Sequence, residues 1–230
     1  NRTKVGSCFY SDLSTFSFHP VKPITTGEGG MVTTNSKKIY EKLLIFRTHG
    51  IHKNSKDFKN KSFAFDKNGN VNRWYYEMSH LGYNYRITDI QASLGNSQLK
   101  RLDKFTSTRN KIAKIYNRSF KNNEFITTPS VKENVKHAYH LYTLLVDFKG
   151  IKKTRNQVMK ELAKFNIGTQ VLYIPVFLQP YYKKKYNYKN IQFKNSIEYY
   201  NQALSIPLFT SLNRKEIFYI IKKINEVINK

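Results

Sequence analysis

Residues 14–30 read STFSFHPVKPITTGEGG and place a lysine between two prolines, after an apolar strand and before a glycine-rich turn. Pro20 and Pro23 flank Lys22, and prolines on both sides exclude this stretch from a helix and from the interior of a sheet. The pattern therefore predicts a rigid turn at the end of a strand. Turns in that position are where α/β proteins present catalytic groups.

The turn carries a primary amine close in sequence to groups that can bind phosphate. A lysine partly shielded from water loses its proton more easily and becomes an amine nucleophile. The hydroxyls of Ser17 and Thr25 can bind phosphate, and the glycines permit close backbone approach. A single lysine is nevertheless a weak signal, because most turn lysines are simply solvated. The residues by themselves leave both interpretations open.

The segments on either side of Lys22 predict short strands followed by a helix. Apolar alternation indicates strands at residues 13–18 and 31–34. Ser36 can cap the next helix, and Gly50 is expected to end it. Residues 51–72 are polar and are predicted to form a loop, whose length indicates function or mobility.

Two capping-box patterns mark helix starts farther along the chain. Thr88 and Gln91 open a long helical region that is expected to bend near residues 105–107, and Thr154 and Gln157 open another helix. The remaining expected elements are strands at residues 141–146 and 169–174 and helices at residues 196–204 and 213–228.

The alternation of strands and helices predicts an α/β or α+β protein. A length of 230 residues suits one or two domains. The pattern changes near residue 104, which predicts a first domain at residues 1–104 and a second at residues 105–230.

The composition is strongly basic, with 40 Lys and Arg against 15 Asp and Glu, a net charge of +25. Such a balance suggests an anionic partner, whether nucleic acid, a phosphorylated ligand or a membrane surface. The longest basic run is only residues 183–185, and the abundance of Asn, Ile, Tyr and Phe points to AT-rich codons. This pattern favours solvated lysines over a nucleic-acid surface.

Several classes of site and location are disfavoured by the sequence. Cys8 is the single cysteine, which excludes an intrachain disulfide and fits a reducing, cytoplasmic compartment. No apolar stretch approaches the roughly 20 residues of a membrane helix, so no membrane partner is expected. His137 and His140 lie three apart, but no third ligand is near, so we expect no metal site.

Five segments, in order, resemble the DegT/StrS family of sugar aminotransferases. The resemblance runs from about Lys4 to the end of the chain and is far more specific than any one segment. The matching segments are SFHPVKPITTGEGG at residues 17–30, RTHG at 47–50, LGYNYRITDIQASL at 81–94, the GTQ, YIP and QPYY strings within 168–182, and ALSIPL at 203–208.

The resemblance implies an α/β fold, that of the fold type I (aspartate-aminotransferase-like) transferases that depend on pyridoxal 5'-phosphate. Residues 1–104 would be the C-terminal part of the large cofactor-binding domain, and residues 105–230 the small α+β domain. Lys22 would bind the cofactor covalently and shuttle a proton, and Ser17 would bind its phosphate. Asn84 would reach the phosphate in a partner subunit's site, since the family forms homodimers with shared active sites. Arg86 would approach the substrate diphosphate, although a turn role for Asn84 and an ion pair of Arg86 with Asp89 are the structural alternatives.

The same resemblance implies a substrate class. Within the family, the segments are most similar to transaminases of pseudaminic acid synthesis, which act on UDP-linked 4-keto-6-deoxy sugars, with L-glutamate as the expected amino donor. His19 and Tyr173 are candidates for substrate binding, although ordinary packing explains either. Leu172 and Phe177 depart from the family, where histidine is common, and this leaves the sugar open.

The family also has a substantial segment upstream of this sequence, which supplies an aspartate to the cofactor ring and an aromatic that stacks on it. We therefore expect the 230-residue chain alone to be inactive and poorly stable. The alternatives are an inactive remnant or one half of a split enzyme, and a basic protein that binds anions or nucleic acid. Lys22 argues against the dehydratases of the family, which carry histidine there.

Overall fold

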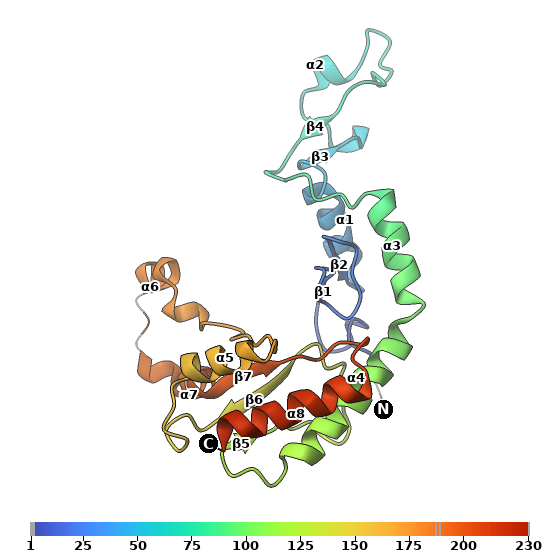
Figure 1. The fold of residues 1–230 in the computed structure, drawn as a ribbon. Coiled ribbons are helices and arrows are strands. Elements are labelled where there is room, and N and C mark those ends of the chain that lie inside the picture. Colours follow the sequence, from blue (N-terminus) through green and yellow to red (C-terminus); the bar gives the residue numbers. More distant parts are fainter. Residues whose placement is uncertain (1–2, 187, 189, 230) are drawn as a thin grey trace. The chain divides into compact units, whose positions relative to one another are not determined.

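A computed structural model describes residues 3–186, 188 and 190–229. The chain divides into two compact units, Asn1–Lys100 and Arg101–Lys230, and Figure 1 labels the elements of each. Among the described residues, no helix combines the length and the apolar character that crossing a membrane requires.

The first unit begins with the hairpin that carries the lysine turn. Strand β1 (Ser14–Ser17) pairs antiparallel with β2 (Gly30–Thr33), and the register ends with Ser17 opposite Gly30. Helix α1 (Lys37–Phe46) follows, and the Ser36 hydroxyl accepts the Ile39 N–H at 3.4 Å. The two strands and the Ser36 cap are thus confirmed. The helix stops at Phe46, earlier than expected.

The prediction of a plain loop at residues 51–72 is wrong. Residues 51–78, which we call the β3–β4 segment, contain β3 (Ile51–His52), the short 3-10 helix η1 (Ser55–Asp57) and α2 (Lys61–Ala64), and β3 pairs antiparallel with β4 (Glu77–Met78). The Glu77 carboxylate accepts the N–H groups of Lys59 and Asn60 at 2.8–2.9 Å and the Tyr75 hydroxyl at 2.9 Å. The Glu77 side chain therefore ties residues 59–60 to β4, a contact between residues 17 and 18 positions apart that local patterning does not reveal.

Two helices join the units. Helix α3 (Asp89–Leu99) starts with the predicted capping box of Thr88 and Gln91. Helix α4 (Leu102–Phe120) runs without interruption through residues 105–107, so the bend expected there is wrong. The break lies instead at Lys100 and Arg101, where the chain passes from one unit to the other.

The second unit is a three-stranded antiparallel sheet covered by helices. The strand order is β5 (Ile126–Thr127), β6 (Tyr142–Val146) and β7 (Ala203–Ile206). Helix α8 (Arg214–Ile228) packs against α4 and α5 (Arg155–Lys164), and the apolar faces of these helices and strands form one buried core (Figure 1). The other elements are η2 (Val176–Leu178), α6 (Pro180–Tyr186), η3 (Asn190–Phe193) and α7 (Lys194–Gln202).

Two boundaries in the second unit differ from expectation. Residues 169–174 form no strand, and only Gln170 makes an isolated bridge to Ser205. Residues 203–204 belong to β7, whereas the sequence pattern assigned them to a helix. All four residues of β7 are buried, and a short apolar run of this kind does not distinguish strand from helix.

A close backbone contact joins α1 to the segment after β4. Tyr83 N–H donates to the Phe46 carbonyl at 3.1 Å, His49 N–H donates to the Tyr83 carbonyl at 2.9 Å, and Thr48 bridges to Asn84. A Cβ added at Gly82 would lie 2.2 Å from the Gly50 nitrogen. The contact therefore requires glycine on both sides, and we call it the glycine contact.

Gly50→Ala and Gly69→Ala form a matched pair that tests the glycine contact. Both residues have a left-handed backbone, with φ of 71° and 80°. Alanine at Gly69 meets nothing within 4 Å and bears only the backbone cost of about 1–2 kcal/mol. At Gly50 the new Cβ also lies 1.7 Å from the His80 carbonyl oxygen, so we expect a clearly larger loss in the free energy of unfolding, measured in urea. Equal losses would contradict the importance of the contact.

The β3–β4 segment is expected to open in acid. The N–H groups of Asn60 and Lys59, more than the Tyr75 hydroxyl and His52, hold the pKa of Glu77 below its ordinary value of 4.5. A carboxylate whose pKa is lowered by folding stabilises the folded state at every pH above its ordinary, unfolded-state pKa. This stabilisation is lost as the pH falls through the lower pKa of the folded state.

Trp74 is the only tryptophan of the chain, lies in this segment, and reports the opening by its fluorescence. We expect a transition below pH 4.5 in the unaltered protein and an open segment at neutral pH in Glu77→Gln. Glu41→Gln, on an exposed face of α1, is the control and should keep the transition. An unchanged acid transition in Glu77→Gln would show that another group controls this segment.

Candidate active site

Lys22 lies on a turn that closes the end of the β1–β2 hairpin. Its N–H donates to the His19 carbonyl at 2.9 Å, which makes Pro20 the second residue of a tight turn, a position that favours proline. At the base of the turn, Phe18 N–H donates to the Gly29 carbonyl at 2.9 Å and Thr26 N–H donates to the Phe18 carbonyl at 3.0 Å. The half-buried lysine therefore rises from a loop that is fixed on both sides.

The hydroxyl groups near Lys22 differ in their availability. Ser17 is exposed, and its hydroxyl oxygen accepts the His19 N–H at 3.4 Å, so the hydroxyl keeps a proton to donate. Thr25 donates to the Phe18 carbonyl at 2.9 Å and accepts the Gly27 N–H at 2.9 Å. Ser17 therefore remains the better phosphate donor, because Thr25 is already used to shape the loop.

His19 lies beside an acidic side chain. Its Nε2 is 3.9 Å from the Glu28 carboxylate, and both side chains are largely exposed. An exposed pair of this kind contributes little to stability. The exposed imidazole of His19 is therefore accessible to a ligand at the lysine turn.

Asn84 and Arg86 lie on one extended segment between the glycine contact and α3. Both side chains are exposed, and the backbone of Asn84 forms the isolated antiparallel bridge with Thr48. Among the described residues, no ion pair joins Arg86 to Asp89, so this part of the structural alternative is not seen. The guanidinium is thereby open to an anion.

Tyr173 belongs to the second unit and is 74% exposed. It lines a pocket of about 410 Å³ together with Phe177 and Tyr199. Phe177 is buried and stacks on Phe193, with ring centroids 4.2 Å apart. The departure from histidine at this position therefore has a packing reason.

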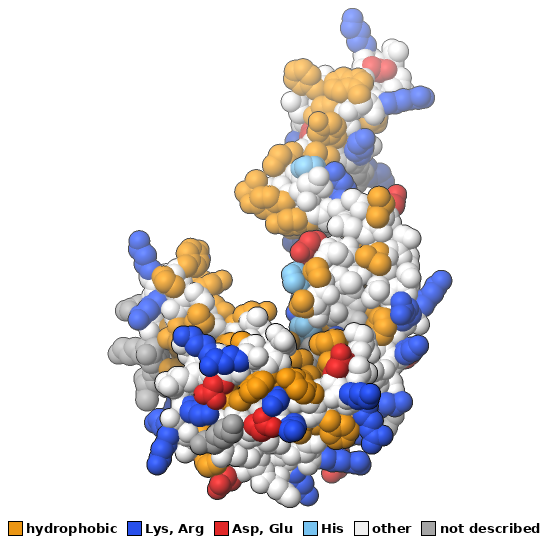
Figure 2. Space-filling model, viewed as in Figure 1, with side chains coloured by type: hydrophobic (Ala, Val, Ile, Leu, Met, Phe, Trp, Pro, Cys, Tyr) orange, Lys and Arg blue, Asp and Glu red, His pale blue; other side chains and the backbone are white. Residues whose placement is uncertain are grey.

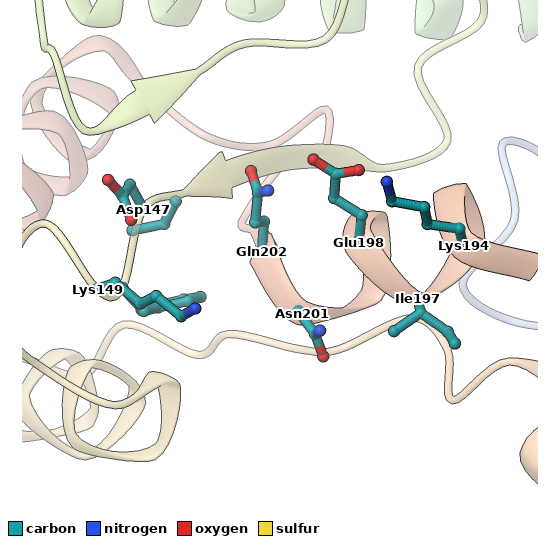
Figure 3. Close-up of a pocket in the computed structure, with 9 residues that line it drawn as sticks. Asp147, Lys149, Lys194, Ile197, Glu198, Asn201 and Gln202 are labelled. Carbon is teal, nitrogen blue, oxygen red and sulfur yellow. The ribbon is translucent and has the colours of Figure 1, made fainter. Parts of the chain in front are cut away.

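A larger pocket, of about 950 Å³, involves none of the predicted site residues. Figure 3 shows Lys194, Glu198 and Gln202 along one face of α7, and Asp147 and Lys149 from the segment after β6. Charges of both signs surround an apolar floor, and no single ligand chemistry follows from this lining. No sequence pattern predicts this pocket, because its walls come from segments far apart in the chain.

Two supporting residues of the lysine turn were not predicted. Thr26 is 3% exposed, and its hydroxyl donates to the Glu28 carbonyl at 2.6 Å. Gln91, predicted only as part of a helix cap, also donates from Nε2 to the same carbonyl at 3.2 Å. A local pattern cannot reveal a bond between residues 63 positions apart.

The groups around the turn fit a phosphorylated aldehyde. Lys22 offers a primary amine and Ser17 a hydroxyl donor, whereas the exposed amide of Asn84 lies on a separate segment. An amine condenses with an aldehyde, and hydroxyl and amide N–H groups bind phosphate oxygens.

The curated proteins similar to this chain include the following two. An uncharacterized protein of Methanocaldococcus jannaschii is 40% identical over 98% of this chain and 56% of its own length. The UDP-4-amino-4,6-dideoxy-N-acetyl-beta-L-altrosamine transaminase of Campylobacter jejuni is 35% identical over 99% of this chain and 54% of its own length. The chain thus spans about half the length of the curated relatives that it matches.

Solved structures show the same fold. PseC of Helicobacter pylori, an aminotransferase of pseudaminic acid biosynthesis, superposes with a TM-score of 0.81 at 30% identity, over 96% of this chain and 54% of its own. The PLP form of a Streptococcus pneumoniae protein described as a sugar aminotransferase gives 0.80 at 27% identity, over 99% of this chain and 54% of its own. The fold is therefore the fold type I architecture expected from the sequence.

The model of the DegT/DnrJ/EryC1/StrS aminotransferase family matches residues 2–225, a range that includes every predicted site residue. The chain belongs to the DegT/DnrJ/EryC1/StrS aminotransferase family.

Proposed function

We propose that this chain carries the lysine-bearing part of a pyridoxal-phosphate-dependent aminotransferase that acts on a nucleotide-linked keto sugar. The observation that carries the proposal is the placement of Lys22 on a fixed turn at the end of a strand, in a chain of this family. Residues 1–104 would contribute to the large domain, and residues 105–230 would form the small domain.

Lys22 is proposed to hold the cofactor through its amine. When bound, pyridoxal phosphate serves as an electron sink for the carbon that loses a proton. Lys22 Nζ would then be the base that holds and moves the proton taken from the donor's Cα. The prolines on either side limit the motion of the backbone, so the amine can return to the same place after each half of the reaction.

The other predicted residues would bind charge and sugar. Ser17 would donate its hydroxyl proton to the cofactor phosphate, and Asn84 would do so in the site of a second copy of the chain. Arg86, whose side chain is exposed, would bind the diphosphate of the substrate, for which a planar guanidinium is suited. His19 and Tyr173 would contact the sugar.

The substrate is proposed to be a UDP-linked 4-keto-6-deoxy sugar, aminated at C4 with L-glutamate as the donor. The similarity to the Campylobacter jejuni transaminase and to PseC supports the pseudaminic acid pathway. The basic surface suits an anionic nucleotide sugar. Figure 2 shows Lys and Arg spread over the visible face of each unit, which fits general attraction of anions better than a nucleic-acid groove. A cytoplasmic homodimer with shared sites fits this assignment.

Replacement of Lys22 tests the proposal. We expect Lys22→Ala to abolish attachment of pyridoxal phosphate, because no other amine would lie at the same place on the turn. After borohydride reduction, peptide mass spectrometry should find the label at Lys22 in the unaltered protein and in the control Lys38→Ala, whose lysine lies exposed on α1. The 230-residue chain alone is expected to be inactive, so transamination is measured in the complete enzyme of which this chain is proposed to be part; there, transfer from glutamate to the UDP-linked keto sugar should fall by at least about a thousandfold in Lys22→Ala.

Two results would contradict the proposal. The first is an unchanged amount of bound cofactor in Lys22→Ala. The second is salt-dependent retention of nucleic acid as the only measurable activity, surviving Lys22→Ala, which would favour the basic binding protein instead.

A further inference from the structure

We propose that Gln91, at the start of α3, is a positioning residue for Lys22. Its side-chain amide makes two connections at once. The Oε1 atom accepts the Thr88 N–H at 3.0 Å and thereby completes the helix cap. The Nε2 atom donates to the Glu28 carbonyl at 3.2 Å and thereby ties the helix to the loop that carries the lysine.

The Glu28 carbonyl is the point on which that loop depends. It also accepts the Thr26 hydroxyl at 2.6 Å, and Thr26 N–H donates to the Phe18 carbonyl at 3.0 Å. Lys22 lies between Phe18 and Thr26, so both ends of its turn are held by this set of bonds. Gln91 adds the only one of these bonds that comes from outside residues 18–29.

Glycines confirm how closely α3 approaches the loop. A Cβ at Gly95, one helical turn after Gln91, would lie 2.9 Å from Thr26 Cγ2. A Cβ at Gly29 would lie 2.4 Å from the Thr26 hydroxyl oxygen. The buried Thr26 is therefore enclosed by α3 on one side and by its own loop on the other.

This arrangement matters because Lys22 must return to one position. The inference rests on the proposed function, in which Lys22 binds a cofactor and moves a proton. Displacement of such a group by about 1 Å costs orders of magnitude in rate. Gln91 is placed to act through the loop, so it is a positioning and not a catalytic residue.

The chain contains a matched control. Gln157 completes a capping box with Thr154 that has the same bonds as that of Thr88 and Gln91, but it lies at the start of α5 in the second unit. Glutamate at either position keeps the acceptor that the cap needs, and glutamate is common there. Only at Gln91 does this change remove the donor to the lysine loop and set a carboxylate against a carbonyl oxygen.

The experiment compares Gln91→Glu with Gln157→Glu in the purified protein. The first measurement is hydrogen exchange of the Phe18, Lys22 and Thr26 amides, which needs no cofactor. We expect about tenfold faster exchange in Gln91→Glu and no change in Gln157→Glu. The second is the rate at which pyridoxal phosphate and borohydride label Lys22 relative to Lys38, which should fall severalfold in Gln91→Glu alone.

Gly95→Ala serves as a second variant, in case Gln91→Glu folds poorly. Alanine is a better helix former than glycine, so α3 itself gains stability, while the new Cβ presses on Thr26. We expect exchange of the Thr26 amide to rise although the unfolding temperature does not fall. A role limited to helix capping would not produce that combination.

The outcomes separate the two proposals. Unchanged exchange of the three amides in both Gln91→Glu and Gly95→Ala would overturn the positioning role. Absence of label at Lys22 in the unaltered protein would overturn the proposed function, while the exchange data would still decide whether Gln91 holds the loop.

Discussion

The first unit depends on close approach between backbone segments that only glycine permits. Within its described residues, the buried apolar side chains are Phe58 and Ala64, so a large apolar core does not hold it together. At the glycine contact, two backbone segments pack directly against each other. A Cβ at either Gly50 or Gly82 would overlap backbone atoms of the other segment. The RTHG and GYNYR strings therefore occur together for a physical reason: they are the two halves of one contact.

The second unit is stabilised in a different way. Large side chains such as Tyr116 and Tyr142 are fully buried in its core, and burial raises the pKa of both hydroxyls. Their hydroxyls bond to the Pro207 carbonyl and to Asn117, as buried polar groups must. Arg109 is also buried, and its Nη1 donates to three carbonyl oxygens, those of Tyr139, His140 and Leu208. The second unit, to which Tyr173 belongs, is therefore stabilised by both apolar packing and buried hydrogen bonds.

The features that the sequence predicted are those set by neighbouring residues. The helix caps at Thr88 and Thr154 and the turn at Lys22 follow from local chemistry, and all three are present. The wrong predictions lie where contacts between residues far apart in the sequence determine the secondary structure. Glu77 binds residues 59–60 of the β3–β4 segment, the helical region is broken at Lys100 and Arg101, and the buried residues of β7 form a strand. In the candidate site, the turn that carries Lys22 was predictable from its prolines, whereas its function stays a prediction, and the bond from Gln91 was not foreseen.

These contacts also explain how the parts of the candidate site are coupled. The segment from Gly82 to Gln91 is held at one end by the glycine contact and at the other by the bond to the Glu28 carbonyl. Asn84 and Arg86 lie between these two anchors, and Lys22 lies on the loop that the second anchor holds. A short extended segment fixed at both ends has little freedom to shift. The bond from Gln91 to the Glu28 carbonyl therefore links the segment that carries Asn84 and Arg86 directly to the loop that carries Lys22.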